Sequence, residues 1–170
     1  MFTKVLVANR GAVAARVVQA LQCLGIPSVA VYSDADADAP YLALACEAHR
    51  LGPAPPKESY LNQERILQLL RQTGCDALHP GYGFLAENAG FAAAVGKAGA
   101  TFIGPSASWL STMGHKTGAI ELLARHGMPV NRSTQVLHTD EELVEQAAAI
   151  GYPVLIKPAG GGGGIGMLIA

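Results

Sequence analysis

The sequence has little charge, few aromatic side chains and no long hydrophobic run. Only 15% of its 170 residues are charged, 6% are aromatic, and the formal net charge is −1. A net charge this small offers no electrostatic basis for binding nucleic acid or an anionic membrane. No apolar stretch approaches the ~20 residues that span a bilayer, and strand-like residues follow Met1 where a secretory signal would stand. These features predict a cytoplasmic protein with neither nucleic-acid nor membrane partners.

Cysteine is also scarce, and its spacing is uninformative. Cys23, Cys46 and Cys75 are odd in number and far apart. They match neither a disulfide framework nor a close-set zinc site. We expect three reduced, mostly buried thiols and no metal site in these 170 residues.

Two common nucleotide-binding signatures are missing. No Gly-Lys-Ser/Thr follows the glycine run near the end of the sequence, and the first apolar segment does not lead into GxGxxG. The absence of the first excludes a Walker A loop, and the absence of the second disfavours a nicotinamide enzyme.

What the sequence does contain is a regular alternation of strand-like and helix-like segments. Continuous apolar runs predict strands at 5–8, 29–32, 77–79 and 101–103. Helical spacing predicts helices at 12–24, 62–72 and 87–97, with a short helix at 41–48 before a brief strand near 50–51. Because parallel strands need covering crossovers, this alternation predicts a doubly wound, Rossmann-like α/β fold with a parallel sheet.

In such a sheet, ligands bind beyond the carboxyl ends of the strands. The loops at 9–11, 33–34, 80–87 and 104–106 follow predicted strands. We therefore expect these four loops to share one rim, where the function is to be sought.

The chain is predicted to have three parts: a domain over 1–112, a connecting helical segment over 113–128, and the start of a second domain over 129–170. In the last part, Thr139 begins a helix with a capping box, residues 153–157 form a strand, and residues 167–170 form another strand without a partner. An unpaired strand is a poor end for a domain. We therefore expect a fragment of a longer protein.

The glycine run is the most informative local stretch, and it consists of Gly160, Gly161, Gly162, Gly163, Gly164 and Gly166. Consecutive glycines let backbone N–H groups approach an anion, and the run follows an apolar strand, which favours a phosphate loop over a linker. Lys157, at the end of that strand, either neutralises phosphate or is solvated. Lys116 begins a helix, where a positive charge opposes the macrodipole; this favours an external anion, with an exposed lysine as the alternative.

Motifs along the entire chain resemble those of biotin carboxylases in the ATP-grasp superfamily. They are VLVANRG at 5–11, VAVYSDADA at 29–37, ESYLN at 58–62, HPGYGFLAENAGFA at 79–92, FIGPSA at 102–107, MGHK at 113–116 and YPVLIKPAGGGGGIGM at 152–167. The resemblance implies a pre-ATP-grasp domain followed by the start of an ATP-grasp lid. It also implies a ligase in which ATP phosphorylates bicarbonate to carboxyphosphate, whose CO₂ passes to biotin.

The same resemblance implies cofactors and partners. The cofactors and substrates are ATP, Mg²⁺ or Mn²⁺, bicarbonate, and biotin carried on a partner domain. The partners are a biotin carboxyl carrier domain, a carboxyltransferase and a second copy of the chain, with Arg16 at the dimer interface. The residue-based alternative for Arg16 is an ordinary surface arginine on an amphipathic helix.

The resemblance also assigns residues to the site. It implies that Lys116, Lys157 and the glycine run bind ATP. It places His79, Tyr82, Gly83 and Glu87 at the border of a biotin and bicarbonate pocket. The metal-binding and catalytic residues are expected beyond Ala170, so the chain alone should be inactive.

The residue types leave alternatives open within that pocket. His79 is interpreted as a strand-end hydrogen-bonding residue rather than a general base. Glu87 either positions a cation or bicarbonate, or interacts with the dipole of the following helix. Tyr82 packs either on biotin or within its own turn.

Three residues depart from the family pattern. Ala12 stands where Glu is usual, His115 where Asp is common, and Ile165 where many relatives have Lys or Arg. The apolar Ile165 resembles the urea carboxylase branch, which leaves an acyl-CoA, pyruvate or urea open as the final carboxyl acceptor. Ile165 also supports a non-catalytic nucleotide-binding or assembly module. Another ATP-grasp ligase is the remaining alternative, against which the HPGYGFLAEN segment argues.

Overall fold

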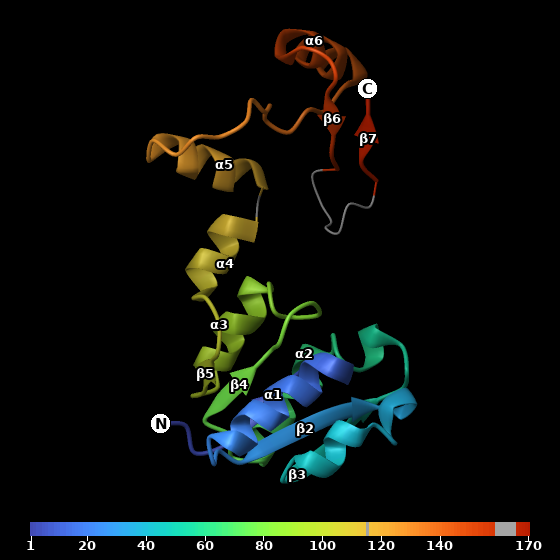
Figure 1. Ribbon diagram of the computed structural model, residues 1–170, viewed down its shortest axis with the longest axis vertical. Helices are drawn as coiled ribbons and strands as arrows, with labels where there is room; N and C mark the ends of the chain where they lie inside the picture. Colours follow the sequence, from blue (N-terminus) through green and yellow to red (C-terminus); the bar gives the residue numbers. More distant parts are fainter. Residues whose placement is uncertain (115, 159–165) are drawn as a thin grey trace. The chain divides into compact units, whose positions relative to one another are not determined.

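The computed structural model describes residues 1–114, 116–158 and 166–170 and divides into two units, Met1–Ser111 and Thr112–Ala170 (Figure 1). The first unit is built on a parallel sheet in the order β3-β2-β1-β4-β5. Its strands are β1 (Val5–Val7), β2 (Ser28–Ser33), β3 (Glu47–Gly52), β4 (Ala77–His79) and β5 (Thr101–Phe102). This arrangement confirms the predicted doubly wound α/β fold.

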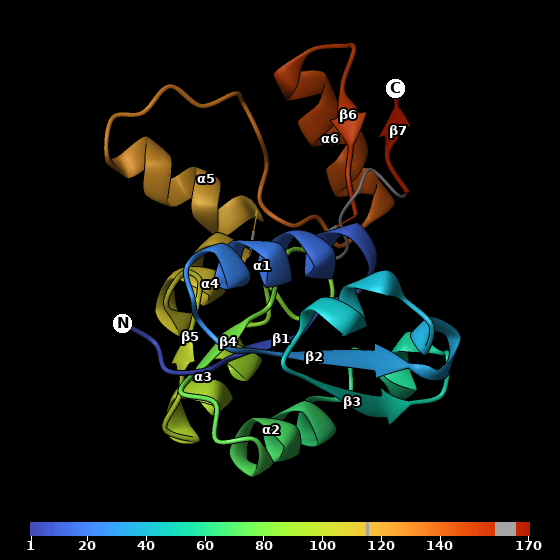
Figure 2. The same ribbon diagram turned by 60° about the horizontal axis from the view of Figure 1, so that its bottom comes forward.

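Helices cover both faces of this sheet, as Figure 2 shows for α1 and α2. The helices of the first unit are α1 (Gly11–Cys23), α2 (Gln63–Gln72) and α3 (Ala89–Lys97). Side chains alternate along each strand, so Val5 and Val7 pack in one apolar cluster with Val18 of α1, whereas Leu6 packs in the other with Ile66 of α2. The sheet thus lies between two buried apolar layers.

Two helices begin at asparagine caps. The Asn62 side chain accepts a hydrogen bond from Arg65 N at 3.0 Å, and the Asn88 side chain accepts one from Phe91 N at 2.8 Å. Each bond satisfies an otherwise unpaired backbone donor in a first helical turn. The predicted start of the third helix at Glu87 was therefore wrong by two residues, because the cap at Asn88 leaves Glu87 outside α3.

The segment between β2 and α2 differs from the prediction. Three short 3-10 helices occur here, η1 (Asp34–Asp36), η2 (Pro40–Leu44) and η3 (Pro56–Glu58). The expected helix over 41–48 was wrong, because η2 ends at Leu44 and residues 47–48 already pair with β2. As an edge strand, β3 alternates half-buried and exposed residues along its first four positions, so it lacks the continuous apolar run that identified the inner strands.

The cysteines follow the expectation only in part. All three are free, but Cys23 and Cys46 are exposed and only Cys75 is buried. The prediction of mostly buried thiols was therefore wrong. Cys23 ends α1, and Cys46 immediately precedes the edge strand β3, so neither lies in an apolar layer.

The second unit consists of short elements. The helix α4 (Ala107–Gly114) crosses the division between the units, and it is followed by α5 (Lys116–Arg125), α6 (Asp140–Ile150), β6 (Leu155–Ile156) and β7 (Leu168–Ile169). The strands β6 and β7 pair antiparallel, so the expectation of an unpaired final strand was wrong. Backbone bonds in both directions between Val154 and Ala170, at 2.8 and 3.0 Å, extend the pair beyond both strands.

The start of α6 has the predicted cap with one change. The Thr139 side chain accepts a hydrogen bond from Glu142 N at 3.2 Å. The Glu142 carboxylate accepts a hydrogen bond from His138 N at 2.8 Å, where a capping box would use the Thr139 N–H.

None of the helices in the part of the chain that the structure describes has the length and apolar composition of a membrane span.

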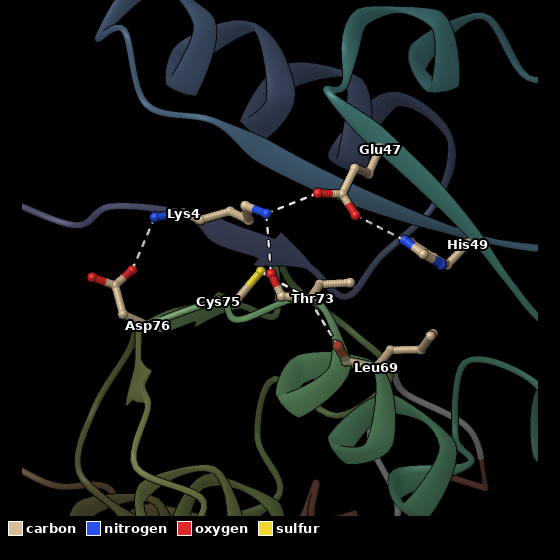
Figure 3. A network of polar contacts seen from close by, with 7 residues as sticks. All are labelled: Lys4, Glu47, His49, Leu69, Thr73, Cys75 and Asp76. Atoms are coloured by element: carbon tan, nitrogen blue, oxygen red, sulfur yellow. Dashed lines mark hydrogen bonds and ion pairs between the residues drawn. The ribbon is translucent and has the colours of Figure 1, made fainter.

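A polar network joins the amino ends of the strands (Figure 3). Lys4 Nζ donates to Glu47 Oε1 at 2.8 Å and to the Thr73 carbonyl at 3.0 Å. The Asp76 carboxylate accepts from the backbone N–H groups of Lys4 and Thr3, and these bonds lower the pKa of Asp76 below its ordinary value. The network holds the amino ends of the strands together. Ligands are expected at the opposite end of the sheet, beyond the carboxyl ends of the strands.

Candidate functional site

The strand order reverses at the carboxyl ends of β1 and β4, and Asn9 bridges these two strand ends. Its side chain is 2% exposed. Asn9 Nδ2 donates to the Pro80 carbonyl at 2.7 Å and to the Tyr82 carbonyl at 2.9 Å, and Asn9 Oδ1 accepts from Arg10 N at 2.8 Å. The amide therefore fixes the loop after β4 against the end of β1, at the place where doubly wound sheets form their ligand crevice.

Gly81 is required by this contact. A Cβ at this position would lie 2.6 Å from Asn9 Nδ2 and 2.6 Å from Val13 Cγ1, and the Gly81 φ of +66° is one that side chains disfavour. The turn can therefore approach Asn9 and α1 only because residue 81 has no side chain.

His79 is the last residue of β4, and its ring is part of the same turn. Its Nδ1 accepts a hydrogen bond from Gly81 N at 3.0 Å, so the neutral ring carries its proton on Nε2. Burial lowers the pKa of His79 below its ordinary value. The geometry agrees with the interpretation of His79 as a strand-end hydrogen-bonding residue.

Three other predicted pocket residues lie on the exposed part of the loop over 80–87. Tyr82 is 75% exposed, and Gly83 and Glu87 are also exposed. Tyr82 therefore does not pack within its own turn. Glu87 precedes the Asn88 cap, so its carboxylate lies outside the first turn of α3. The loop thus offers an aromatic ring and a carboxylate to solvent beside the buried Asn9 contact.

A second polar cluster on this rim centres on Asp36, which the sequence reasoning did not single out. Asp36 Oδ2 accepts from Ser33 Oγ and from the Tyr60 hydroxyl, both at 2.7 Å, and Asp36 Oδ1 accepts from Arg10 at 2.6 Å. Burial opposes ionisation of Asp36, yet these donors outweigh it and hold the pKa of the carboxyl below its ordinary value. The carboxylate joins the segments that follow β1, β2 and β3.

Tyr60 connects this cluster to the loop after β4. Its side chain is 1% exposed, and its hydroxyl also accepts from Ser33 N at 3.0 Å. The Tyr60 ring stacks on Phe84, with centroids 5.0 Å apart and planes at 21°. Four strand ends are thereby linked, which confirms a shared rim for the loops after β1, β2 and β4. The only sequence signal for Asp36 and Tyr60 is that both stand in family-like motifs, SDADA and ESYLN.

The residues predicted to bind phosphate belong to the second unit. Lys157 is exposed immediately after β6, and α5 begins at Lys116. Gly166 is described and directly precedes Met167, next to β7. Gly160 to Gly164, Ile165 and His115 lie outside the described residues.

Arg16 and Ala12 are both exposed on α1, and the first turn of that helix contains no acidic residue. Among residues 1–114, 116–158 and 166–170, no group of three His, Cys, Asp or Glu side chains could hold a metal ion.

A doubly wound sheet whose strand order reverses between β1 and β4 defines a class of α/β domains that bind nucleotides and other small molecules. Within that class, residues 1–110 match the family model described as biotin carboxylase, N-terminal domain. The chain therefore belongs to the biotin carboxylase N-terminal domain family. Residues 115–170 match the model described as carbamoyl-phosphate synthase L chain, ATP binding domain.

Relatives in this family match along nearly the whole chain. It is 48% identical to biotin carboxylase 1 of Bacillus subtilis over 171 aligned residues, covering 100% of this chain and 38% of that protein. It is 50% identical to the mitochondrial methylcrotonoyl-CoA carboxylase subunit alpha of Oryza sativa, covering 98% of this chain and 23% of that protein. The chain thus spans less than two-fifths of the length of these relatives.

A solved structure gives the same result for the fold. The biotin carboxylase domain dimer of Hydrogenobacter thermophilus 2-oxoglutarate carboxylase, in complex with MgADP, ADP and bicarbonate, superimposes with a TM-score of 0.95 at 46% identity. The match covers 99% of this chain and 37% of that one. Both units therefore have counterparts in a biotin carboxylase domain.

Proposed function

We propose that the protein carrying this chain is an ATP-dependent ligase that carboxylates biotin with bicarbonate. The observation that carries the proposal is the continuous match of both units, at a TM-score of 0.95, to a biotin carboxylase domain complexed with MgADP and bicarbonate. An ATP-dependent route through carboxyphosphate activates bicarbonate for transfer to biotin. A carboxyphosphate hydrolyses readily, so such a site must exclude water and supply fixed donors for phosphoryl charge.

In this proposal, the loop over 80–87 borders the biotin and bicarbonate pocket. The exposed Tyr82 ring offers a flat surface for the biotin ring system, and the exposed Glu87 carboxylate positions a polar or cationic group. His79 remains neutral and orients the backbone at Gly81 through its Nδ1 acceptor. Gly83 keeps the loop free of a side chain next to Tyr82.

Lys116, Lys157 and the glycine run are proposed to bind the phosphates of ATP. Support comes from the exposed position of Lys157 immediately after β6, where an ammonium group can neutralise phosphate charge. In the complete protein, Mg²⁺ or Mn²⁺ would neutralise further phosphate charge. The proposed domain division is 1–112 for the amino-terminal domain, 113–128 for the connection and 129–170 for the start of the ATP-grasp domain.

The proposed partners are a biotin carboxyl carrier domain, a carboxyltransferase and a second copy of the chain contacting Arg16. Support for assembly comes from relatives that are carboxylase subunits and from the dimer of the Hydrogenobacter domain. The carboxyltransferase would select the final acceptor, which is an acyl-CoA, pyruvate or urea.

Bicarbonate-dependent ATP hydrolysis with free biotin tests the function. The assay uses the complete gene product, because the chain spans 38% of biotin carboxylase 1. We expect phosphate release that requires both bicarbonate and biotin, and no stimulated release from residues 1–170 alone. Tight ATP binding without such release would instead favour the non-catalytic module, which Ile165 supports.

Lys157→Ala tests the assignment of the phosphate site. We expect it to weaken ATP binding by roughly 10- to 100-fold, because one contact to a charged group contributes about 1.5–3 kcal/mol. Adenosine binding should change little, since adenosine carries no phosphate. The matched control is Lys97→Ala, which removes an exposed lysine from the end of α3. Titrations that weaken adenosine and ATP equally would show that Lys157 contacts another part of the nucleotide.

A further inference from the structure

Phe84 has an unusual conformation in the middle of the proposed biotin loop. Its φ is +42°, and it is the only described residue other than glycine with a positive φ. This region is unfavourable for a residue with a Cβ, so surrounding contacts must hold it. Phe84 follows the exposed Tyr82 and Gly83 and precedes Glu87, so its backbone decides where those groups are presented.

The Phe84 ring stacks on the ring of Tyr60, and the Tyr60 hydroxyl makes two hydrogen bonds. The hydroxyl donates to Asp36 Oδ2 at 2.7 Å and accepts from Ser33 N at 3.0 Å. Asp36 is held in turn by Ser33 Oγ and Arg10. A phenylalanine would supply the same apolar ring, so the hydroxyl serves to fix the ring's position.

We infer that Asp36 and Tyr60 are positioning residues that hold the loop over 80–87 in the shape that receives biotin. The inference rests on the proposed function of that loop. Both polar groups are occupied by one another and by Ser33 and Arg10, so they act on a ligand through Phe84 and do not touch it. Loss of the Tyr60 hydroxyl would free its ring, release Phe84 and loosen the loop.

Tyr60→Phe tests the inference, with Thr73→Val as the matched control. The Thr73 hydroxyl is part-buried and donates to the Leu69 carbonyl at 2.7 Å, at the amino ends of the strands and away from the 80–87 loop. Each variant loses one hydroxyl that is hydrogen-bonded within the first unit, so their effects on global stability should be similar. Only Tyr60→Phe frees the ring that stacks on Phe84 of the 80–87 loop.

Amide hydrogen exchange on residues 1–170 gives the first readout. Ala86 N and Asn88 N donate to the Gly83 and Leu85 carbonyls at 2.9 and 3.1 Å and report local opening of the loop. Tyr60→Phe should accelerate exchange at both amides roughly fivefold, as expected for one lost hydrogen bond. Thr73→Val should leave these amides at the wild-type rate.

A double variant tests whether the effect passes through the stacked rings. Phe84→Gly removes the ring and tolerates a positive φ, so it should accelerate the same amides. In the double variant, Tyr60→Phe should add nothing further, because the contact that transmits its effect is gone. Additive acceleration would overturn the inference.

Steady-state kinetics on the complete gene product gives the last readout. Tyr60→Phe should raise KM for free biotin several-fold and leave KM for ATP unchanged. Wild-type exchange rates at Ala86 and Asn88 in Tyr60→Phe, equal acceleration in Thr73→Val, or an unchanged KM for biotin would each overturn the positioning role. Absence of biotin-dependent activity in the wild-type protein would refute the proposed function instead, and the exchange result would still decide whether Tyr60 holds the loop.

Discussion

Among single residues, Gly81 gives the sharpest test of the close approach between the β4 loop and Asn9. Gly81 and Gly25 have nearly the same φ, +66° and +67°, but a Cβ at Gly25 would meet nothing within 4 Å. Gly25→Ala should therefore lower the free energy of unfolding by only about 1–2 kcal/mol, which is the cost of a left-handed conformation for a residue with a Cβ. Gly81→Ala should lose about 1–3 kcal/mol more, because its Cβ overlaps Asn9 and Val13. Urea unfolding of both variants measures the difference, and equal losses would show that the turn relaxes without cost.

His79 predicts a dependence of stability on pH. Burial holds its folded pKa below 6.5, the value of a free histidine side chain. As the pH falls below about 6.5, the unfolded chain takes up a proton before the folded chain does, so the free energy of unfolding decreases. His79→Asn keeps an acceptor for Gly81 N and removes the titration, so its stability should change less between pH 8 and pH 5.

The control for that experiment is His126→Asn, since His126 is exposed. It should retain the acid dependence of the wild type in urea unfolding. Asp36 and Asp76, whose pKa values are lowered, contribute stability that is present above about pH 4 and is lost in stronger acid, outside this window. Identical profiles for His79→Asn and wild type would contradict the assignment.

At the residue scale, the sequence predicted the rim but not its contacts. Asn9, Arg10 and the loop at 33–34 were expected there because they follow strands. No local pattern shows that Tyr60 reaches Asp36 across 24 positions, or that Phe84 stacks on Tyr60. Such pairs depend on how separate strand ends converge, which only the folded sheet determines.

At the scale of elements, prediction succeeded where a segment is buried on both sides. The inner strands β1, β2 and β4 are continuous apolar runs, and their positions follow directly from the sequence. The edge strand β3 has an alternating pattern and was assigned partly to a helix. The strands at 153–157 and 167–170 were both predicted, but their pairing as β6 and β7 was missed, because an apolar run indicates a strand without indicating its partner.

Side-chain caps explain the smaller errors in element boundaries. The side chains of Asn62, Asn88 and Thr139 each accept a hydrogen bond from the backbone N–H three residues later in the chain. Each helix begins one residue after its cap. The prediction placed Glu87 inside a helix because the apolar spacing begins soon after it. A cap search would have moved the start past Asn88 and left Glu87 in the loop, as the structure has it.

At the scale of the whole molecule, stability is concentrated in the first unit. Both apolar clusters and the Lys4, Glu47 and Asp76 network lie within residues 1–111. Among the described residues of the second unit, Ala147 is the one buried apolar residue. Because burial of apolar surface supplies most of the driving force for folding, the first unit should fold by itself.

A chain that consists of residues 1–111 alone tests this directly. The isolated unit should unfold in urea with a cooperative far-UV circular dichroism transition. Its midpoint and slope should resemble the main transition of the 170-residue chain, because the slope reflects the surface exposed on unfolding and that surface lies in this unit. Residues 112–170 alone should show no cooperative transition, since one buried apolar residue cannot offset the entropy of ordering the chain. If residues 1–111 were unfolded, or less stable than the intact chain by more than about 1 kcal/mol, the second unit would be contributing to the fold of the first, and the division of the chain near residue 112 would not be a boundary between independent domains.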